Sequence, residues 1–220
     1  NYELKSLVVK DASNKDVTVT NNTFSMPSSN VTISATFAQK SPTLVLTSGS
    51  ASQTVNVNAA ISTIKYTASG SAVSIKVDGL PNGVTAAISG LVATISGKPS
   101  EIGTFNFSVT ATNNESKTTV LSGKIVVNAV APVITKPAST TISATQGVAI
   151  TPITFTSDVA ATFNVTGLPA GLSATTATDG KSVTISGTPT GYGSSNFTVS
   201  ATAYGKTSSV SGSVTVAQKL

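Results

Sequence analysis

The sequence contains no cysteine, no histidine, no tryptophan and no arginine in 220 residues. Without cysteine there are no disulfides and no thiol chemistry, and cysteine usage does not indicate the compartment. Acid–base or nucleophilic catalysis would then depend on eight carboxylates, four tyrosines or the lysines. The carboxylates occur singly, mostly beside turn residues, whereas a glycosidase needs two of them within roughly 5–10 Å. We therefore expect no enzyme activity.

Charge is also scarce: charged residues make up 10% of the chain, and its net charge is +5. The 13 basic residues are all lysine, and they are scattered along the whole sequence. A nucleic-acid-binding protein would concentrate Lys and Arg on one face and use Arg for bidentate phosphate contacts, so we expect no nucleic-acid partner. No stretch approaches the ~18 apolar residues of a membrane span, and no basic segment followed by an apolar run opens the chain. We expect no membrane span here, and a chain processed or cut from a longer one.

Apolar residues, at 39%, alternate with Thr, Ser and Asn, and 17 Gly and 9 Pro occur at intervals. This alternation is typical of half-buried strands, and no segment sustains a helical period. Strand spacings of about 8–12 residues with turn residues between them predict an all-β protein made of antiparallel sandwiches, with about seven strands each. The core positions that the alternation predicts include Ile64, Tyr66, Val73, Ile75, Val77, Phe107, Val109, Phe163, Val165, Val183, Ile185, Phe197 and Val199.

An internal repeat organises most of the chain. The segment "GLP" at Gly79 recurs at Gly167, "ISG" at Ile95 recurs at Ile185, and "FSVTAT" at Phe107 recurs as "FTVSAT" at Phe197. These matches predict two sandwiches of similar length, over residues 40–129 and 130–220, preceded by a different segment over residues 1–39.

The repeated phrase has a structural reading. After Pro169, Gly171 is expected to take a positive φ in a turn, as is Gly83 in the first copy. Asp179-Gly180 predicts a two-residue hairpin connection, with Ser89-Gly90 as its shorter counterpart. Pro189 then ends the pairing of its strand. The residues of this repeated segment therefore have structural roles in turns and strands, and none of them indicates a catalytic or binding site.

The pattern "GLPxGL…ISGxP…G…F.V.ATA" resembles the Ig domain found in tandem in bacterial surface and secreted proteins, which is related to dystroglycan-type cadherin-like domains. This resemblance covers both repeats and implies two Ig-like or cadherin-like sandwiches in an extracellular protein. Residues 1–39 resemble the C-terminal part of an internalin B-repeat-like bacterial surface repeat. The resemblance implies one strand through Tyr2, Leu4, Leu7 and Val9, a turn at Phe24–Pro27, and a last strand from Val31 to Phe37. The opening strands of that repeat are missing, so this β remnant is expected to be truncated.

Together these features predict a non-catalytic stalk or spacer region of a bacterial cell-surface or secreted multidomain protein. Its expected partners are the other domains of the parent chain, and the chain itself is expected to be a monomer. The alternative is an adhesin or carbohydrate-binding module that contacts a glycan or a host protein. Its candidate ligand residues are Tyr192 and Tyr204, which lie near turns and could stack on a sugar or simply cap the end of a sandwich. An exposed patch carrying both would favour binding, and their burial would favour the stalk.

Calcium is the metal to consider, because cadherins bind it between domains. The two linkers, "FAQKSP" and "VNAVAP", contain no carboxylate, however. Asp78 precedes Gly79, but Thr166 replaces it in the second repeat, which favours a residue that simply leads into the turn. We expect neither a metal nor a cofactor.

Overall fold

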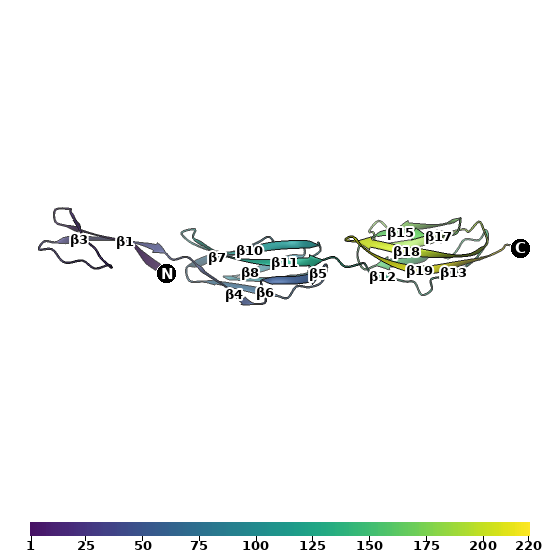
Figure 1. Ribbon diagram of the computed structural model, residues 1–220, viewed down its shortest axis with the longest axis horizontal. Coiled ribbons are helices and arrows are strands. Elements are labelled where there is room, and N and C mark those ends of the chain that lie inside the picture. Colours follow the sequence, from purple (N-terminus) through teal and green to yellow (C-terminus); the bar gives the residue numbers. More distant parts are fainter. The chain divides into compact units, whose positions relative to one another are not determined.

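The computed structural model describes all 220 residues, and Figure 1 shows strands joined by turns and loops. It contains 19 strands in five sheets and no helix, so the all-β prediction is confirmed. The chain divides into two compact units, Asn1–Val127 and Asn128–Leu220. No helix is long and apolar enough to cross a membrane.

The first unit opens with a small sheet in the order β2-β1-β3. Its strands are β1 (Tyr2–Asp11), β2 (Asp16–Val17) and β3 (Val31–Gln39). Apolar residues pair across β1 and β3 on one face, as Leu4 with Phe37 and Val9 with Ile33. Val9 is buried, but Tyr2 and Phe37, towards the other end of this face, are 61% and 60% exposed. The apolar face of the N-terminal sheet is therefore only partly covered.

Sandwich 1 follows in the same unit and consists of two four-stranded sheets, β4-β6-β9-β8 and β5-β11-β10-β7. Its strands are β4 (Thr43–Ser48), β5 (Ser52–Asn56), β6 (Ile64–Ser69), β7 (Ala72–Asp78), β8 (Val84–Ser89), β9 (Val92–Gly97), β10 (Gly103–Asn113) and β11 (Thr118–Asn128).

Sandwich 2 occupies the second unit and repeats this order, with sheets β12-β14-β17-β16 and β13-β19-β18-β15. Its strands are β12 (Ile134–Thr135), β13 (Thr141–Thr145), β14 (Ile153–Ser157), β15 (Thr162–Thr166), β16 (Leu172–Thr176), β17 (Ser182–Gly187), β18 (Gly193–Ala203) and β19 (Lys206–Ala217). Four strands facing three or four, in this order, is the Ig-like arrangement.

The expected seven strands per sandwich become eight because the first strand is split between the two sheets. In sandwich 2, β12 pairs with β14 in one sheet, and β13 pairs with β19 in the other. Pro137 lies between the two halves and cannot donate a backbone hydrogen bond, so the first half ends early. The β13–β19 pair is parallel, a departure from the expected wholly antiparallel sandwich.

An edge-to-face aromatic pair lies at the centre of each core. The ring centroids of Tyr66 and Phe107 are 6.5 Å apart in sandwich 1, and those of Phe155 and Phe197 are 6.2 Å apart in sandwich 2. Phe107 is paired across the strands with Gly123, and Phe197 with Gly212. A Cβ atom at either glycine would run into the phenylalanine ring, so the glycine makes room for the ring.

Three details of the sequence prediction are wrong. Val73 is 52% exposed, because the pairing of β7 with β10 shifts register between Thr112 and Asn113 and turns Val73 outward. Asp179-Gly180 is not a two-residue connection: Ala177 N–H donates to Ser182 O at 2.9 Å, so the loop spans residues 178–181. The two-residue turn in sandwich 1 is Gly90-Leu91, since Ser89 pairs with Val92.

The positive φ predicted at the repeated turn is confirmed, with values of 84° at Gly83 and 89° at Gly171. Leu172 N–H donates to Pro169 O at 3.1 Å, which closes the turn around Gly171. Thr188 N–H then donates to Gly171 O at 2.9 Å. A Cβ atom at Gly171 would point directly onto the carbonyl oxygen of Thr188, so both conformation and space require glycine here.

The chain enters each sandwich at one end and leaves at the other. In sandwich 2, Ile134 pairs with Ser157 at one end, and Ala217 pairs with Thr145 at the far end. In sandwich 1, the Thr119 hydroxyl donates to Pro42 O at 2.5 Å where the chain enters, and β11 then runs the length of the sandwich to Asn128. At about 3.3 Å per residue, a last strand of this length separates the two ends by about 35 Å.

Candidate functional site

The two predicted ligand residues lie at opposite ends of β18. Tyr192 immediately precedes Gly193 and is 64% exposed. Tyr204 immediately follows Ala203 and is half-buried, with a φ of 51° in a two-residue turn that it forms with Gly205. Because β18 is 11 residues long, the two tyrosines are about 40 Å apart. They do not form a common patch, and neither is buried; each remains a candidate on its own.

Several side-chain hydrogen bonds gather at the β10–β11 hairpin of sandwich 1. Asn113 is buried, and its side-chain Oδ1 accepts the N–H groups of Glu115 at 3.0 Å and Lys117 at 2.9 Å. Its Nδ2 donates to Lys40 O at 2.9 Å. Asn113 therefore fixes the hairpin and also ties it to the segment that leads into the sandwich.

The same hairpin holds Gln39, the last residue of the N-terminal sheet. Both carboxylate oxygens of Glu115 accept the Gln39 backbone N–H at 3.1 Å, and the Lys117 ammonium donates to Gln39 O. Lys117 Nζ is also 3.9 Å from Glu115 Oε2. We call Asn113, Glu115 and Lys117 the junction clamp, because they bind the backbone where the N-terminal sheet meets sandwich 1.

Further bonds reinforce the junction from the β6–β7 turn. The Ser71 hydroxyl donates to Lys40 O at 2.5 Å, and Asn1 Nδ2 donates to Gly70 O at 2.9 Å. Sequence reasoning missed this group. The available signal was the hairpin "NNESK", which replaces the shorter "AYGK" of the second repeat. The hydrogen bonds of the junction clamp all go to backbone groups, and its two charged side chains lie next to each other, so its role is structural.

No three Asp or Glu side chains come together as a possible metal site. Asp78 ends β7 on the surface and is 2.8 Å from Lys76 Nζ, as fits a residue that leads into a turn. Asp158 Oδ1 accepts the Val133 N–H at 2.7 Å and ties the segment before β12 to the end of β14. Two buried side-chain oxygens, Gln39 Oε1 and the Tyr66 hydroxyl, have no hydrogen-bond partner. Burial raises the pKa of Tyr66, and its place in the core keeps it from any substrate.

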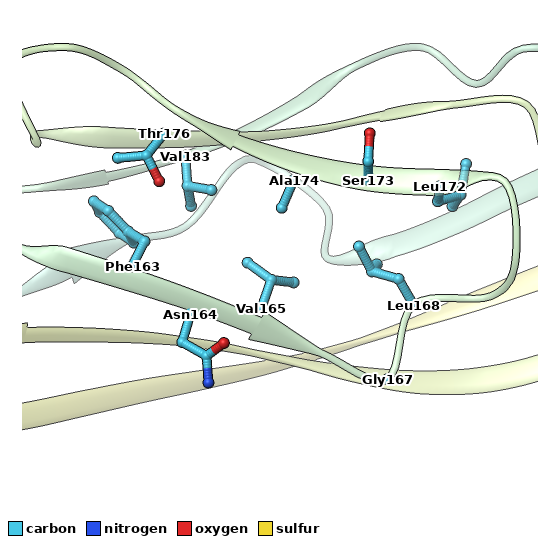
Figure 2. A pocket seen from close by; sticks show the side chains of 10 residues that line it. All are labelled: Phe163, Asn164, Val165, Gly167, Leu168, Leu172, Ser173, Ala174, Thr176 and Val183. Atoms are coloured by element: carbon cyan, nitrogen blue, oxygen red, sulfur yellow. The ribbon is translucent and has the colours of Figure 1, made fainter.

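A groove of about 440 Å³ opens between β15 and β16 of sandwich 2. Figure 2 shows Phe163, Val165 and Leu168 on one side, facing Leu172 and Ala174 on the other. No charged side chain lines the groove, and four of its apolar residues pack against the core: Phe163, Val165, Leu168 and Leu172. In sandwich 1 the residues equivalent to Phe163 and Leu172 are Ile75 and Val84, which are buried, at 7% and 6% exposure. The side chains at these two positions are therefore buried in sandwich 1 and only half-buried in sandwich 2, where they line the groove.

Comparison with known proteins gives only distant likenesses. No family model matches the chain, and no curated protein matches it. The titin domains Z1Z2, solved in complex with telethonin, match at 15% identity and a TM-score of 0.45, over 83% of this chain and 100% of that one. The endo-fucoidan hydrolase MfFcnA4 from glycoside hydrolase family 107 matches at 17% identity and a TM-score of 0.42, over 88% of this chain and 33% of that one. We draw no function from likenesses at this level.

Proposed function

We propose that this chain is a non-catalytic stalk or spacer region of a bacterial cell-surface or secreted multidomain protein. One observation carries the proposal: the chain passes through each sandwich from one end to the other, between Ile134 and Ala217 in sandwich 2. A domain crossed in this way adds its own length, about 35 Å, between the segment before it and the segment after it. The partners are then the other domains of the parent chain.

The pairing at the last strand also suits a segment that carries tension. Because β13 and β19 run parallel, forces applied where the chain enters and leaves pull these neighbours in opposite directions. Their hydrogen bonds are then loaded together rather than one after another. The junction clamp serves the same purpose, since it fixes Gln39 and Lys40 to sandwich 1 through side-chain bonds from Asn113 and Glu115.

The bacterial and extracellular parts of the proposal rest on sequence resemblance. The "GLPxGL…ISGxP" pattern is that of tandem Ig domains related to dystroglycan-type cadherin-like domains, and residues 1–39 are similar to part of an internalin-type repeat. The partly uncovered face of the N-terminal sheet, with Tyr2 and Phe37 exposed, suits a piece of such a repeat.

The alternative function is an adhesin or carbohydrate-binding module. Tyr192 favours it, because a tyrosine that is 64% exposed beside Gly191 and Gly193 could stack on a sugar ring. The separation of about 40 Å from Tyr204 weakens the alternative, since a sugar platform usually needs more than one group in reach.

Binding of the full chain to arrays of glycans and extracellular-matrix proteins distinguishes the two functions. A spacer gives no binding at micromolar concentration. Binding that disappears in Tyr192→Ala and persists in Tyr204→Ala would contradict the spacer function. It would show instead a binding module at the end of sandwich 2 that carries Tyr192. The two variants are matched controls, because they change the same residue type at opposite ends of one strand.

A further inference from the structure

The strand β15 is an unprotected sheet edge. It is the last strand of its sheet and pairs only with β18. Its sequence, "TFNVT", has no charge and no proline, and its register with β18 is unbroken from Thr162 to Thr166. Natural sheets usually block such edges with charges, bulges or proline, because free backbone groups recruit another strand.

The equivalent edge of sandwich 1 is protected. Lys76 lies in β7 and is paired with Thr110, as Asn164 is paired with Ser200 at the same place in sandwich 2. Lys76 also forms an ion pair with Asp78, and the register shift next to Val73 interrupts the edge. The two copies of the repeat therefore differ in two protective features, and both are absent from β15.

The sequence of β15 is complementary to itself. If two such strands run antiparallel about Asn164, Thr162 is opposite Thr166, and Phe163 is opposite Val165 of the second strand. The two Asn164 residues then face each other, and carboxamides can donate and accept hydrogen bonds in such a pair. The same arrangement about Lys76 in β7 would bring two ammonium groups together, and like charges directly opposite are unfavourable.

We propose that a second copy of this chain is the occupant of the β15 edge. Two copies pair β15 with β15 about a two-fold axis at Asn164, so that the sheet β13-β19-β18-β15 continues from one copy into the other. The Phe163 and Val165 side chains of each copy then lie beside the groove of its neighbour. Five residues form a small contact, so the chain is a monomer in dilute solution and pairs where copies are crowded. This pairing is independent of the spacer role.

The absence of cysteine gives a direct test. Asn164→Cys places the only thiol of the chain on the proposed axis, and opposite residues of antiparallel strands have Cα atoms about 4.5–5.5 Å apart, which a disulfide can span. Mild oxidation should give a covalent dimer, of twice the 21.9 kDa monomer, at least about tenfold faster than for Asn114→Cys, which places an exposed thiol on a hairpin away from the sheet edge. Equal rates for the two variants would overturn the proposal.

Sedimentation equilibrium of the unlabelled chain gives a second, independent test. The average mass should rise with concentration, and Asn164→Lys, which gives β15 the lysine found at this place in β7, should weaken association at least about tenfold. The melting temperature controls for folding, because Asn164 is exposed. Association that survives Asn164→Lys would overturn the proposal. A chain that stays monomeric at millimolar concentration would also overturn the proposal. This holds even if that chain binds a synthetic peptide of residues 160–168, because the proposed occupant is a second copy of the folded chain.

Discussion

The two sandwiches are copies of one repeat that has diverged at several places. They share their strand order, the Pro-x-Gly turn, and the phenylalanine that packs against a facing glycine. They differ at the centre of the core, where Tyr66 stands in one and Phe155 in the other. They also differ at the tip of the last hairpin and at the centre of one edge strand. The shared features are those that the fold itself requires. The hairpin tip lies where sandwich 1 meets the N-terminal sheet, and the edge strand lies at the border of its sheet.

The hairpin tips show this most clearly. In sandwich 1 the tip carries Asn113, Glu115 and Lys117, which bind the backbone of Gln39 and Lys40. In sandwich 2 the tip is the tight turn Tyr204-Gly205, with no side-chain hydrogen bond to another segment. The longer hairpin is therefore an adaptation to the N-terminal sheet and not a requirement of the sandwich.

The largest expected effect comes from removing a central aromatic ring. Phe197→Ala should cost sandwich 2 about 3–5 kcal/mol, because the buried ring packs edge to face on Phe155 and leaves a cavity. Hydrogen exchange through a denaturant series, read separately for each sandwich, measures the loss. Phe107→Ala is the matched variant in sandwich 1. A loss shared equally by both sandwiches, from either variant, would show that they do not fold as separate modules.

Breaking the shared turn should have the next largest effect. Gly171→Ala forces an alanine into a φ of 89° and onto the carbonyl of Thr188, which should destabilise sandwich 2 by about 2 kcal/mol. Gly191→Ala is the control, because a Cβ atom there meets nothing within 4 Å. Thermal unfolding compares the two, and equal melting temperatures would refute the turn assignment.

Removing the junction clamp sharpens the contrast between the hairpins. Asn113→Ala deprives the N–H groups of Glu115 and Lys117 of their acceptor and leaves the Lys40 carbonyl with the Ser71 hydroxyl alone, which should cost about 1–2 kcal/mol in sandwich 1. The amide of Gln39 should also exchange faster with solvent. Asn114→Ala, an exposed neighbour, should change neither quantity. Unaltered exchange at Gln39 in the Asn113 variant would contradict the clamp.

The smallest effect should come from making the cores alike. Tyr66→Phe removes a buried hydroxyl without a partner and should stabilise sandwich 1 by up to about 1 kcal/mol. Burial raises the pKa of the Tyr66 hydroxyl in the folded chain. As the pH rises past about 10, the unfolded chain therefore loses the hydroxyl proton before the folded chain does. The stability of sandwich 1 is therefore unaffected by this group below that pH and falls above it. The fall should be smaller in Tyr66→Phe, which has no hydroxyl to ionise at this position. A variant less stable than the parent at neutral pH would indicate a hidden partner for the hydroxyl.

The alternation of apolar residues and the repeated turn residues were sufficient to predict much of this fold. Alternation marked buried Phe107 and Phe197, and the repeated Pro-x-Gly turn predicted the positive φ of Gly171. The alternation of apolar residues gave wrong predictions where the structure depends on which strand a segment pairs with. A register shift against β10 turned Val73 outward, and the split of the first strand depends on which sheet each half joins.

The candidate sites were harder to predict for the same reason. Tyr192 and Tyr204 are close in sequence, but the extended strand between them holds them at opposite ends of sandwich 2. The junction clamp joins Gln39 to residues about 76 positions away, a distance over which single-sequence periodicity carries no information.

Stretching the full chain by its two ends tests the spacer account most directly. The account predicts two separate unfolding events, one for each sandwich, because each is crossed from end to end and has its own core. Each event should release about 270 Å of chain, the extended length of a sandwich less its folded length. A single event of twice that length, or extension with no resisting event, would contradict the account.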